Sequence, residues 1–81
     1  MAKPSPKHAG HPALASIGKA VRAVRKEQGF SQEALALATE LDRSYVGGIE
    51  RGEHNITILN LLRIAEVLGM SAADLLAHAR V

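Results

Sequence analysis

Apolar residues recur every three to four positions along most of this chain. Ile17, Val21 and Val24 follow this spacing and, with Gln28, predict a helix over 13–28. The same period predicts helices over 32–39, 43–51 and 58–68, and a short fifth helix that carries Leu75 and Leu76. The residues expected to face the core of these later helices are Leu35, Ala38, Val46, Ile49, Ile58, Leu61, Ile64, Ala65 and Leu68. No segment alternates as a strand does, so the pattern predicts an all-α fold of five helices.

Helix boundaries are marked by small polar residues and glycines. The N-cap candidates are Ser31, Asp42, Thr57 and Ser71. Asp74 follows Ser71 by three residues and completes a capping box, in which each side chain satisfies the other's backbone amide. The expected helix stops are Gly29, Gly52 and Gly69.

The second and third predicted helices are joined by only three residues, 40–42. This connection is too short for antiparallel stacking and indicates a steep crossing, as in a helix-turn-helix that places its second helix in the DNA major groove. In that helix Val46 and Ile49 face inward. The opposite side carries Arg43, Ser44, Gly47, Gly48 and Arg51.

Gly47 and Gly48 each cost roughly 1 kcal/mol relative to Ala in a helix interior. Either of two arrangements would offset that loss of helix stability. Either the backbone of the helix closely approaches DNA, or the helix packs tightly against a neighbour in the protein.

Composition narrows the function classes. The 81 residues fit one domain, and the absence of Cys excludes disulfides and thiolate metal sites. Residues 1–12 combine three Pro with two Lys and predict a flexible arm before a domain over 13–81.

The net charge is +2, but from Ala13 onward eight basic residues balance eight acidic ones, so a DNA-binding face depends on where charges lie. No membrane span or signal peptide is evident, which favours the cytoplasm.

Catalytic chemistry has little support in the sequence. There is no glycine-rich phosphate loop and no nucleophile–base pair at meaningful spacing, so an enzyme is not expected. His8 and His11 have an HxxH spacing but no third ligand nearby. We therefore expect no cofactor, metal or small-molecule ligand.

Residues 17–77 resemble the Cro/CI-type (XRE-like) helix-turn-helix family. The resemblance is carried by Ser31-Gln32-Glu33 together with Ile49-Glu50-Arg51-Gly52, and residues 41–52 are similar to the recognition helix of restriction–modification controller proteins. It implies a lambda-repressor-like domain that regulates transcription. It also implies a homodimer that binds a palindromic operator in double-stranded DNA.

The resemblance also implies roles for individual residues. Gln32 would contact a phosphate, Arg43 and Ser44 would meet base edges, and Tyr45 would touch the DNA backbone or a thymine methyl. Arg51 and Asn55 would contact phosphates. Apart from the resemblance, Gly47 and Gly48 are also candidate DNA-contact residues, through the close backbone approach considered above. Arg25 and Glu50 would form a structural ion pair. Two features depart from the family: Gly47 replaces a common Ser, and Glu53 and His54 occupy a loop that is usually more basic. Glu53 there would repel phosphate, and a protonated His54 would bind it.

A second apolar set lies beyond the predicted core. A domain of this size cannot easily bury all of it, and exposed apolar patches usually mark partner surfaces. We therefore expect a dimer interface made by Leu59, Leu62, Leu75, Leu76 and Val81.

The sequence leaves several biological roles open. A controller, a phage-type repressor and an antitoxin all fit the same sequence. A protein-interaction module that kept the fold but lost DNA reading also fits, and it would show no preference among DNA sequences.

Overall fold

The structure is a computed structural model that describes residues 7–81 of the chain. These residues form five helices and no strand, as the sequence predicts. The helices are α1 (Pro12–Glu27), α2 (Gln32–Thr39), α3 (Arg43–Glu50), α4 (Ile58–Val67) and α5 (Ala72–Ala79).

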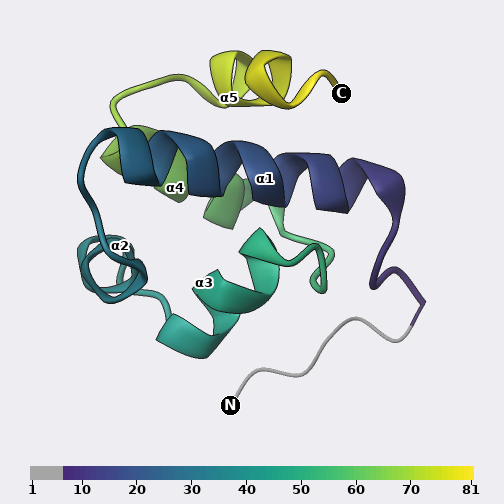
Figure 1. Cartoon of the computed structure of the whole chain (residues 1–81), viewed down its shortest axis with the longest axis horizontal. Coiled ribbons are helices and arrows are strands. Elements are labelled where there is room, and N and C mark those ends of the chain that lie inside the picture. The colour runs from purple at the N-terminus through teal and green to yellow at the C-terminus, as the bar shows by residue number, and fades with distance from the viewer. Residues whose placement is uncertain (1–6) are drawn as a thin grey trace.

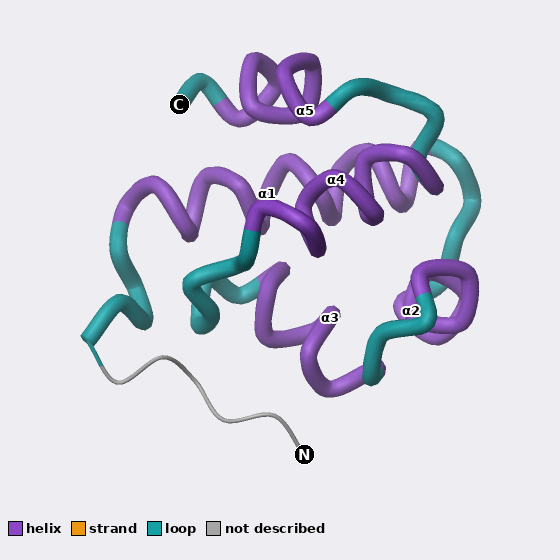
Figure 2. Tube along the Cα trace, turned by 180° about the vertical axis from the view of Figure 1, so that it is seen from behind, coloured by secondary structure: helices purple, strands orange, loops and turns teal. Residues whose placement is uncertain are grey.

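The longest helix, α1, is the centre of the fold. Figure 1 shows α5 along one side of α1 and α3 on the opposite side, with α2 at the end of the molecule where α1 terminates. Seen from behind in Figure 2, α4 runs beside α1. The fold therefore places α3 and α5 on opposite sides of a common support.

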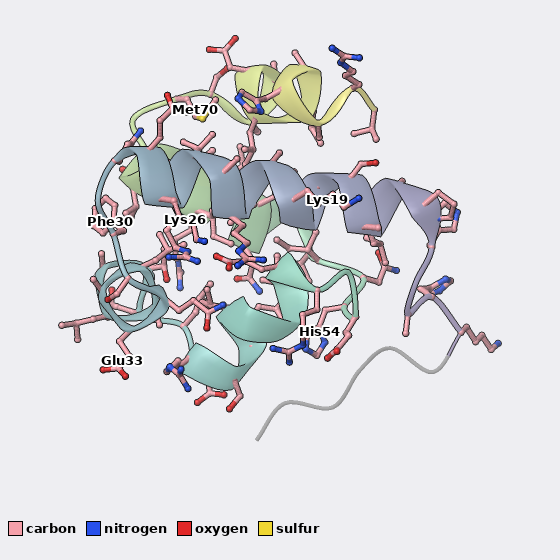
Figure 3. All side chains as sticks on the ribbon, viewed as in Figure 1. Lys19, Lys26, Phe30, Glu33, His54 and Met70 are labelled. Carbon is pink, nitrogen blue, oxygen red and sulfur yellow. The ribbon has the colours of Figure 1, made fainter. Side chains whose placement is uncertain are left out.

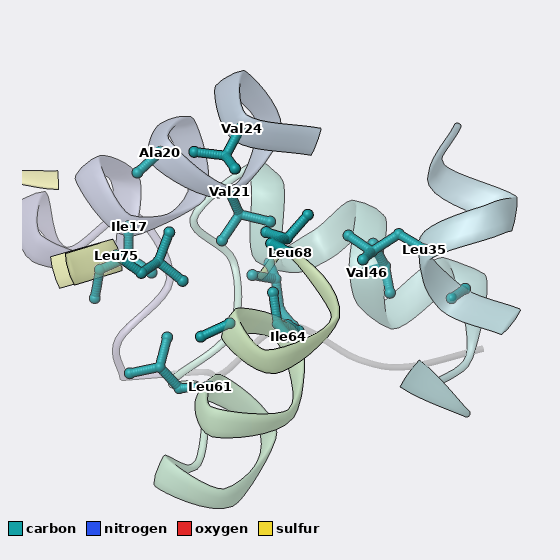
Figure 4. Packing of buried hydrophobic residues seen from close by; sticks show 13 residues of the cluster. Ile17, Ala20, Val21, Val24, Leu35, Val46, Leu61, Ile64, Leu68 and Leu75 are labelled. Atoms are coloured by element: carbon teal, nitrogen blue, oxygen red, sulfur yellow. The ribbon is translucent and has the colours of Figure 1, made fainter. Parts of the chain in front are cut away.

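One hydrophobic core joins all five helices. Figure 4 shows Val21 and Val24 of α1 beside Ile64 and Leu68, with Val46 and Leu35 completing the cluster toward the helix-turn-helix. All of these side chains are buried. Burying one such side chain contributes roughly 1.5–3 kcal/mol, so this core is the main support for the angle of α3.

Close contact between α1 and α3 depends on Gly18, which the periodicity does not single out. A Cβ at Gly18 would overlap the backbone carbonyls of Ile49 and Glu50. Gly52 is equally constrained, because its φ is +74° and a Cβ there would lie 2.9 Å from the Cα of Ala15. These two glycines bring the C-terminal end of α3 directly against α1.

Most of the predicted helix ends are confirmed. The hydroxyls of Ser31, Thr57 and Ser71 accept hydrogen bonds from backbone amides three residues later. Asp42 holds the N-cap position of α3, but its side chain makes no capping hydrogen bond, so that prediction is wrong in its chemistry. Of the proposed capping box, the structure shows the bond from the Asp74 amide to Ser71 Oγ, at 2.9 Å.

Four of the predicted inward or interface positions are corrected. Ala38 is exposed and Ala36 is buried in its place, because a helix of eight residues presents only a narrow face. Gln28 is exposed, although its Nε2 donates to the carbonyl of Leu68 at 2.6 Å. Ile58 is 69% exposed because it begins α4, one turn before the core. Leu75, on the inner face of α5, is fully buried and so cannot belong to a dimer interface.

Part of the segment predicted as a flexible arm, residues 1–12, is structured in the described part of the chain. Pro12 is already the first residue of α1, since proline suits the first helical turn. The Gly10 amide donates to the Gly52 carbonyl at 2.9 Å, so the turn before α1 is joined to the domain. The remainder of the predicted arm, residues 1–6, lies outside the described part of the chain.

Candidate nucleic-acid interface

The turn between α2 and α3 is made by a left-handed residue that is not a glycine. Glu40 has a φ of 59°, and the Leu41 amide donates to the Ala36 carbonyl at 3.0 Å. Leu41 then packs on the core, which turns the chain sharply into α3. This geometry gives the steep crossing that the three-residue connection predicts.

A buried ion pair holds the C-terminal end of α3 to α1. Arg25 Nε donates to Glu50 Oε2 at 2.6 Å, and Arg25 Nη2 donates to Glu50 Oε1 at 3.0 Å. Gln32 Nε2 donates to the same Oε1 at 2.9 Å. The predicted Arg25–Glu50 pair is therefore present, and through Gln32 it also joins the N-terminus of α2 to α3.

The exposed end of α3 is its N-terminal turn. The Arg43 side chain is 62% exposed and lies 3.7 Å from the Glu33 carboxylate, a separation too long for a close hydrogen-bonded pair. Ser44 is half-buried beside it. The guanidinium of Arg43 thus projects from the molecular surface and is only weakly engaged.

Tyr45 faces the protein as well as the surface. Its hydroxyl accepts a hydrogen bond from Asn60 Nδ2 at 3.1 Å, and its ring lies 4.8 Å from the ring of His54. Tyr45 therefore connects α3 to α4 and to the loop after α3. The structure gives it a structural role that the family resemblance does not predict.

The structure explains the second glycine of α3 by packing. A Cβ at Gly48 would overlap the imidazole of His54, which is buried against the helix. His54, labelled in Figure 3, lies in the loop directly below the end of α3. The prediction that His54 is available to bind phosphate is therefore wrong, because its ring fills the space left by Gly48.

Gly47 has a looser environment. A Cβ there would lie 3.0 Å from Arg51 Nη1, the mobile end of an exposed side chain, and 3.6 Å from Gln32 Oε1. Both glycines are buried under side chains of the chain itself. Direct contact of their backbone with DNA would require those side chains to move.

Arg51 is engaged with an acid in the same loop. Its Nε donates to Glu53 Oε2 at 2.8 Å and its Nη2 donates to Oε1 at 3.2 Å. The hydrogen bonds that Arg51 donates to the Glu53 carboxylate raise the pKa of Arg51 and lower the pKa of Glu53. The acid that departs from the family pattern thus competes directly for the cation expected to bind phosphate.

The predicted contact residues lie at the start of α2, on α3 and in the loop that follows α3. Asn55 is exposed in the same loop as Arg51. Sequence reasoning missed Asn60, the packing role of His54 and the close approach at Gly18. Residues 7–81 contain no helix that could span a membrane and no cluster of three or more metal-ligating side chains.

The predicted dimer face is partly exposed. Leu59 is 76% exposed and Leu62 is 47% exposed, and both lie on α4. Val81 is exposed after α5, whereas Leu76 is half-buried against the core. Leu37 and Ile58 add two exposed apolar side chains that the prediction did not include.

Comparisons with known proteins agree with this geometry. A protein-family model described as Helix-turn-helix matches residues 21–75. The control protein C.BamHI of Bacillus amyloliquefaciens is 40% identical over 61 residues, which cover 74% of this chain and 75% of that protein. The transcriptional regulator RamB of Mycobacterium tuberculosis is 46% identical over 56 residues, but these span only 12% of its length and 69% of this chain.

Solved structures show the same arrangement. The restriction–modification controller protein C.AhdI from Aeromonas hydrophila superposes with a TM-score of 0.75 and 44% identity, over 76% of this chain and 94% of that one. The controller protein C.Esp1396I, solved as a tetramer with its natural 35-base-pair operator, has a TM-score of 0.76 and 34% identity over 84% of this chain and 90% of that one. This chain therefore belongs to the Cro/CI-type (XRE-like) helix-turn-helix family, together with restriction–modification controller proteins.

Proposed function

We propose that this protein is a sequence-specific DNA-binding regulator of transcription that inserts the N-terminal turn of α3 into the major groove. The observation that carries the proposal is the exposed, weakly engaged Arg43 at the start of a helix whose other end is fixed by the buried Arg25–Glu50 pair. A side chain that contacts base edges gives sequence specificity only on a rigid support, because it must meet a defined base pair of the DNA.

Base reading is assigned to the start of α3. An Arg that is free to extend forms bidentate hydrogen bonds with guanine O6 and N7, so Arg43 would specify one base pair of each half-site. Ser44 carries less base information. Sequence-dependent DNA shape would then supply part of the specificity.

Phosphate contacts are assigned to both sides of the reading turn. Gln32 begins α2, where free backbone amides and the helix dipole attract an anion, and its side chain is oriented by Glu50. Arg51 and Asn55 would meet the backbone beyond the other end of α3. Arg51 must first leave Glu53, so its contribution is smaller than its charge suggests.

We further propose that the protein acts as a two-fold dimer through the exposed face of α4, with Leu59 and Leu62 at its centre. A symmetric dimer places its reading helices about 34 Å apart and therefore requires a palindromic operator. The operator complex of C.Esp1396I supports an assembly of more than one chain on DNA. The regulator would work in the cytoplasm, with no catalytic step and no cofactor.

The test is selection of bound sequences from a random duplex library at about 150 mM salt. We expect a palindromic motif whose half-sites are separated by about one helical turn. Recovery of no motif from a protein that is helical by circular dichroism would contradict the proposal. That result would favour the protein-interaction module instead.

A further inference from the structure

The turn before α1 is joined to the loop that follows the reading helix. The Gly10 amide donates to the carbonyl of Gly52 at 2.9 Å, and the His11 amide donates to the His8 carbonyl at 2.9 Å. In Figure 1 this turn descends from α1 on the side that carries α3, away from α5. Residues far apart in the sequence are thus placed together beside the C-terminal end of α3.

An open pocket of about 230 Å³ lies where these two segments meet. Its polar lining comes from His8 and His11 on the turn and from Asn55 on the loop, and Ala13 and Leu14 of α1 complete it. All three polar residues are exposed. The pocket therefore adds two imidazole rings to the surface where a phosphate contact by Asn55 is expected.

The hydrogen bonding of His11 determines what its ring can offer. His11 Nδ1 accepts a hydrogen bond from the Ala13 amide at 3.1 Å, so Nδ1 carries no proton. The proton of the ring then lies on Nε2, which makes that nitrogen a donor. The ring can cap α1 and donate to an anion at the same time.

The electrostatic surroundings favour an anion. The first turn of α1 contains no acidic residue, so the positive end of its dipole is not neutralised there. The pocket lining contains no carboxylate among the described residues. The acid of the adjoining loop, Glu53, is already paired with Arg51, and Lys7 adds a positive charge next to His8.

The dimensions of α3 match a phosphate contact at this position. A helix of eight residues is about 12 Å long, close to the width of the major groove of about 12 Å. If the N-terminal turn of α3 meets base edges in the groove, groups beyond its C-terminal end, about 12 Å away, can reach a backbone phosphate. The pocket lies beyond that end, next to Gly52.

We propose that His8 and His11, together with Asn55, form a binding site for one backbone phosphate of the operator, so that the turn over 8–11 is part of the DNA interface. This inference rests on the proposed function. It adds residues that precede the helix-turn-helix to the protein surface that determines affinity.

The test compares the full-length protein with His8→Ala and His11→Ser by measuring Kd for the selected operator and for a random duplex. Serine at position 11 keeps an N-cap for α1 while removing the imidazole. His78→Ala is the matched control, because His78 is exposed on α5, away from α3. Each test variant should raise Kd about two- to tenfold, by the same factor on both duplexes, because phosphate contacts carry no sequence information.

Phosphate ethylation interference then separates contact from a structural effect. Ethylation of one phosphate at the flank of each half-site should weaken the wild-type protein, and this interference should disappear in His8→Ala while the other interfering phosphates remain. Variants that bind and footprint like His78→Ala would overturn the inference while leaving the proposed function intact. Failure of the wild-type protein to bind any duplex would instead overturn both.

Discussion

The imidazole of His54 occupies the space above Gly48 that any other residue would fill with its Cβ. His54 is buried and also lies against the ring of Tyr45, whose hydroxyl is hydrogen-bonded to Asn60 of α4. The glycine and the histidine are thus complementary in shape. Together they position the loop after α3.

This complementarity predicts opposite outcomes for alanine at the two adjacent glycines of α3. Gly48→Ala should destabilise the fold by about 1–3 kcal/mol, because the new methyl group displaces a packed ring. Gly47→Ala meets only the mobile end of Arg51, so it should be neutral or stabilise by up to roughly 1 kcal/mol through helix propensity. Urea denaturation of both variants measures the difference.

A double variant tests whether the ring is the cause. With His54→Ala in the background, Gly48→Ala should cost less than it does alone, because the methyl group then has space. Equal costs in the two backgrounds would show that Gly48 is required for another reason.

The buried pair between α1 and α3 makes a second prediction. Glu50→Ala leaves the Arg25 guanidinium buried without its carboxylate and should cost about 3–5 kcal/mol of unfolding free energy. Against a total of about 5–15 kcal/mol, this loss should be visible as a large fall in the denaturation midpoint.

Glu66→Ala is a suitable control, since Glu66 is exposed on α4 and should change stability by less than about 0.5 kcal/mol. Under conditions in which the Glu50→Ala protein remains folded, it should keep its preference among DNA sequences. Altered preference at unchanged stability would show that Glu50 reads DNA rather than supporting α3.

A third prediction concerns the loop acid. Glu53→Gln removes the carboxylate that holds Arg51 and should tighten binding to all duplexes. If the freed Arg51 gains a phosphate contact, the salt dependence of log Kd should steepen by about 0.9 per protomer. Binding measured over a salt series decides this, and an unchanged slope would mean that Arg51 stays away from DNA.

The same pair has a defined pH dependence. The folded pKa of Glu53 is lowered from its ordinary value of 4.5, mainly by the hydrogen bond from Arg51. The pair therefore stabilises the folded protein above that value, and its contribution is lost as the pH falls through the lowered pKa. The difference in DNA affinity between Glu53→Gln and the wild type should accordingly stay constant through the neutral range.

A fourth prediction tests the proposed dimer. Leu59→Lys together with Leu62→Lys places two charges on the exposed face of α4 without touching the core. The variant should stay folded and sediment as a monomer at tens of micromolar, and it should lose cooperative binding to a palindrome. Leu37→Lys, on the exposed face of α2, should leave assembly unchanged; a monomeric Leu37→Lys would place the interface on α2 instead.

The helices and most of their caps could be predicted because they depend on local patterns. The periodic set Ile17, Val21 and Val24 is enough to define the buried face of α1. The Arg25–Glu50 pair came from the family resemblance, and no spacing rule connects residues on two different helices. Asp42 shows the limit of local rules, since the position is right and the expected hydrogen bond is absent.

The remaining features depend on contacts between distant segments. The burial of Leu75 requires α5 to pack along α1, and Ile58 is exposed because α4 begins before it reaches the core. From sequence alone, His54 beside Glu53 in a loop has the pattern of a surface residue. It is buried because the fold places its imidazole against Gly48. Likewise, no pattern in residues 7–11 indicates that Gly10 would bond to Gly52.

The proposed function depends above all on Arg43, at the exposed start of α3, as the residue that reads the operator. Selection from the same random duplex library with the wild-type protein and with Arg43→Ala tests this directly. We expect Arg43→Ala to recover the same palindrome with the preference relaxed at one base pair of each half-site, at a cost of about 1–3 kcal/mol in binding. An unchanged motif with affinity reduced equally on operator and random DNA would contradict the claim and make Arg43 a phosphate contact.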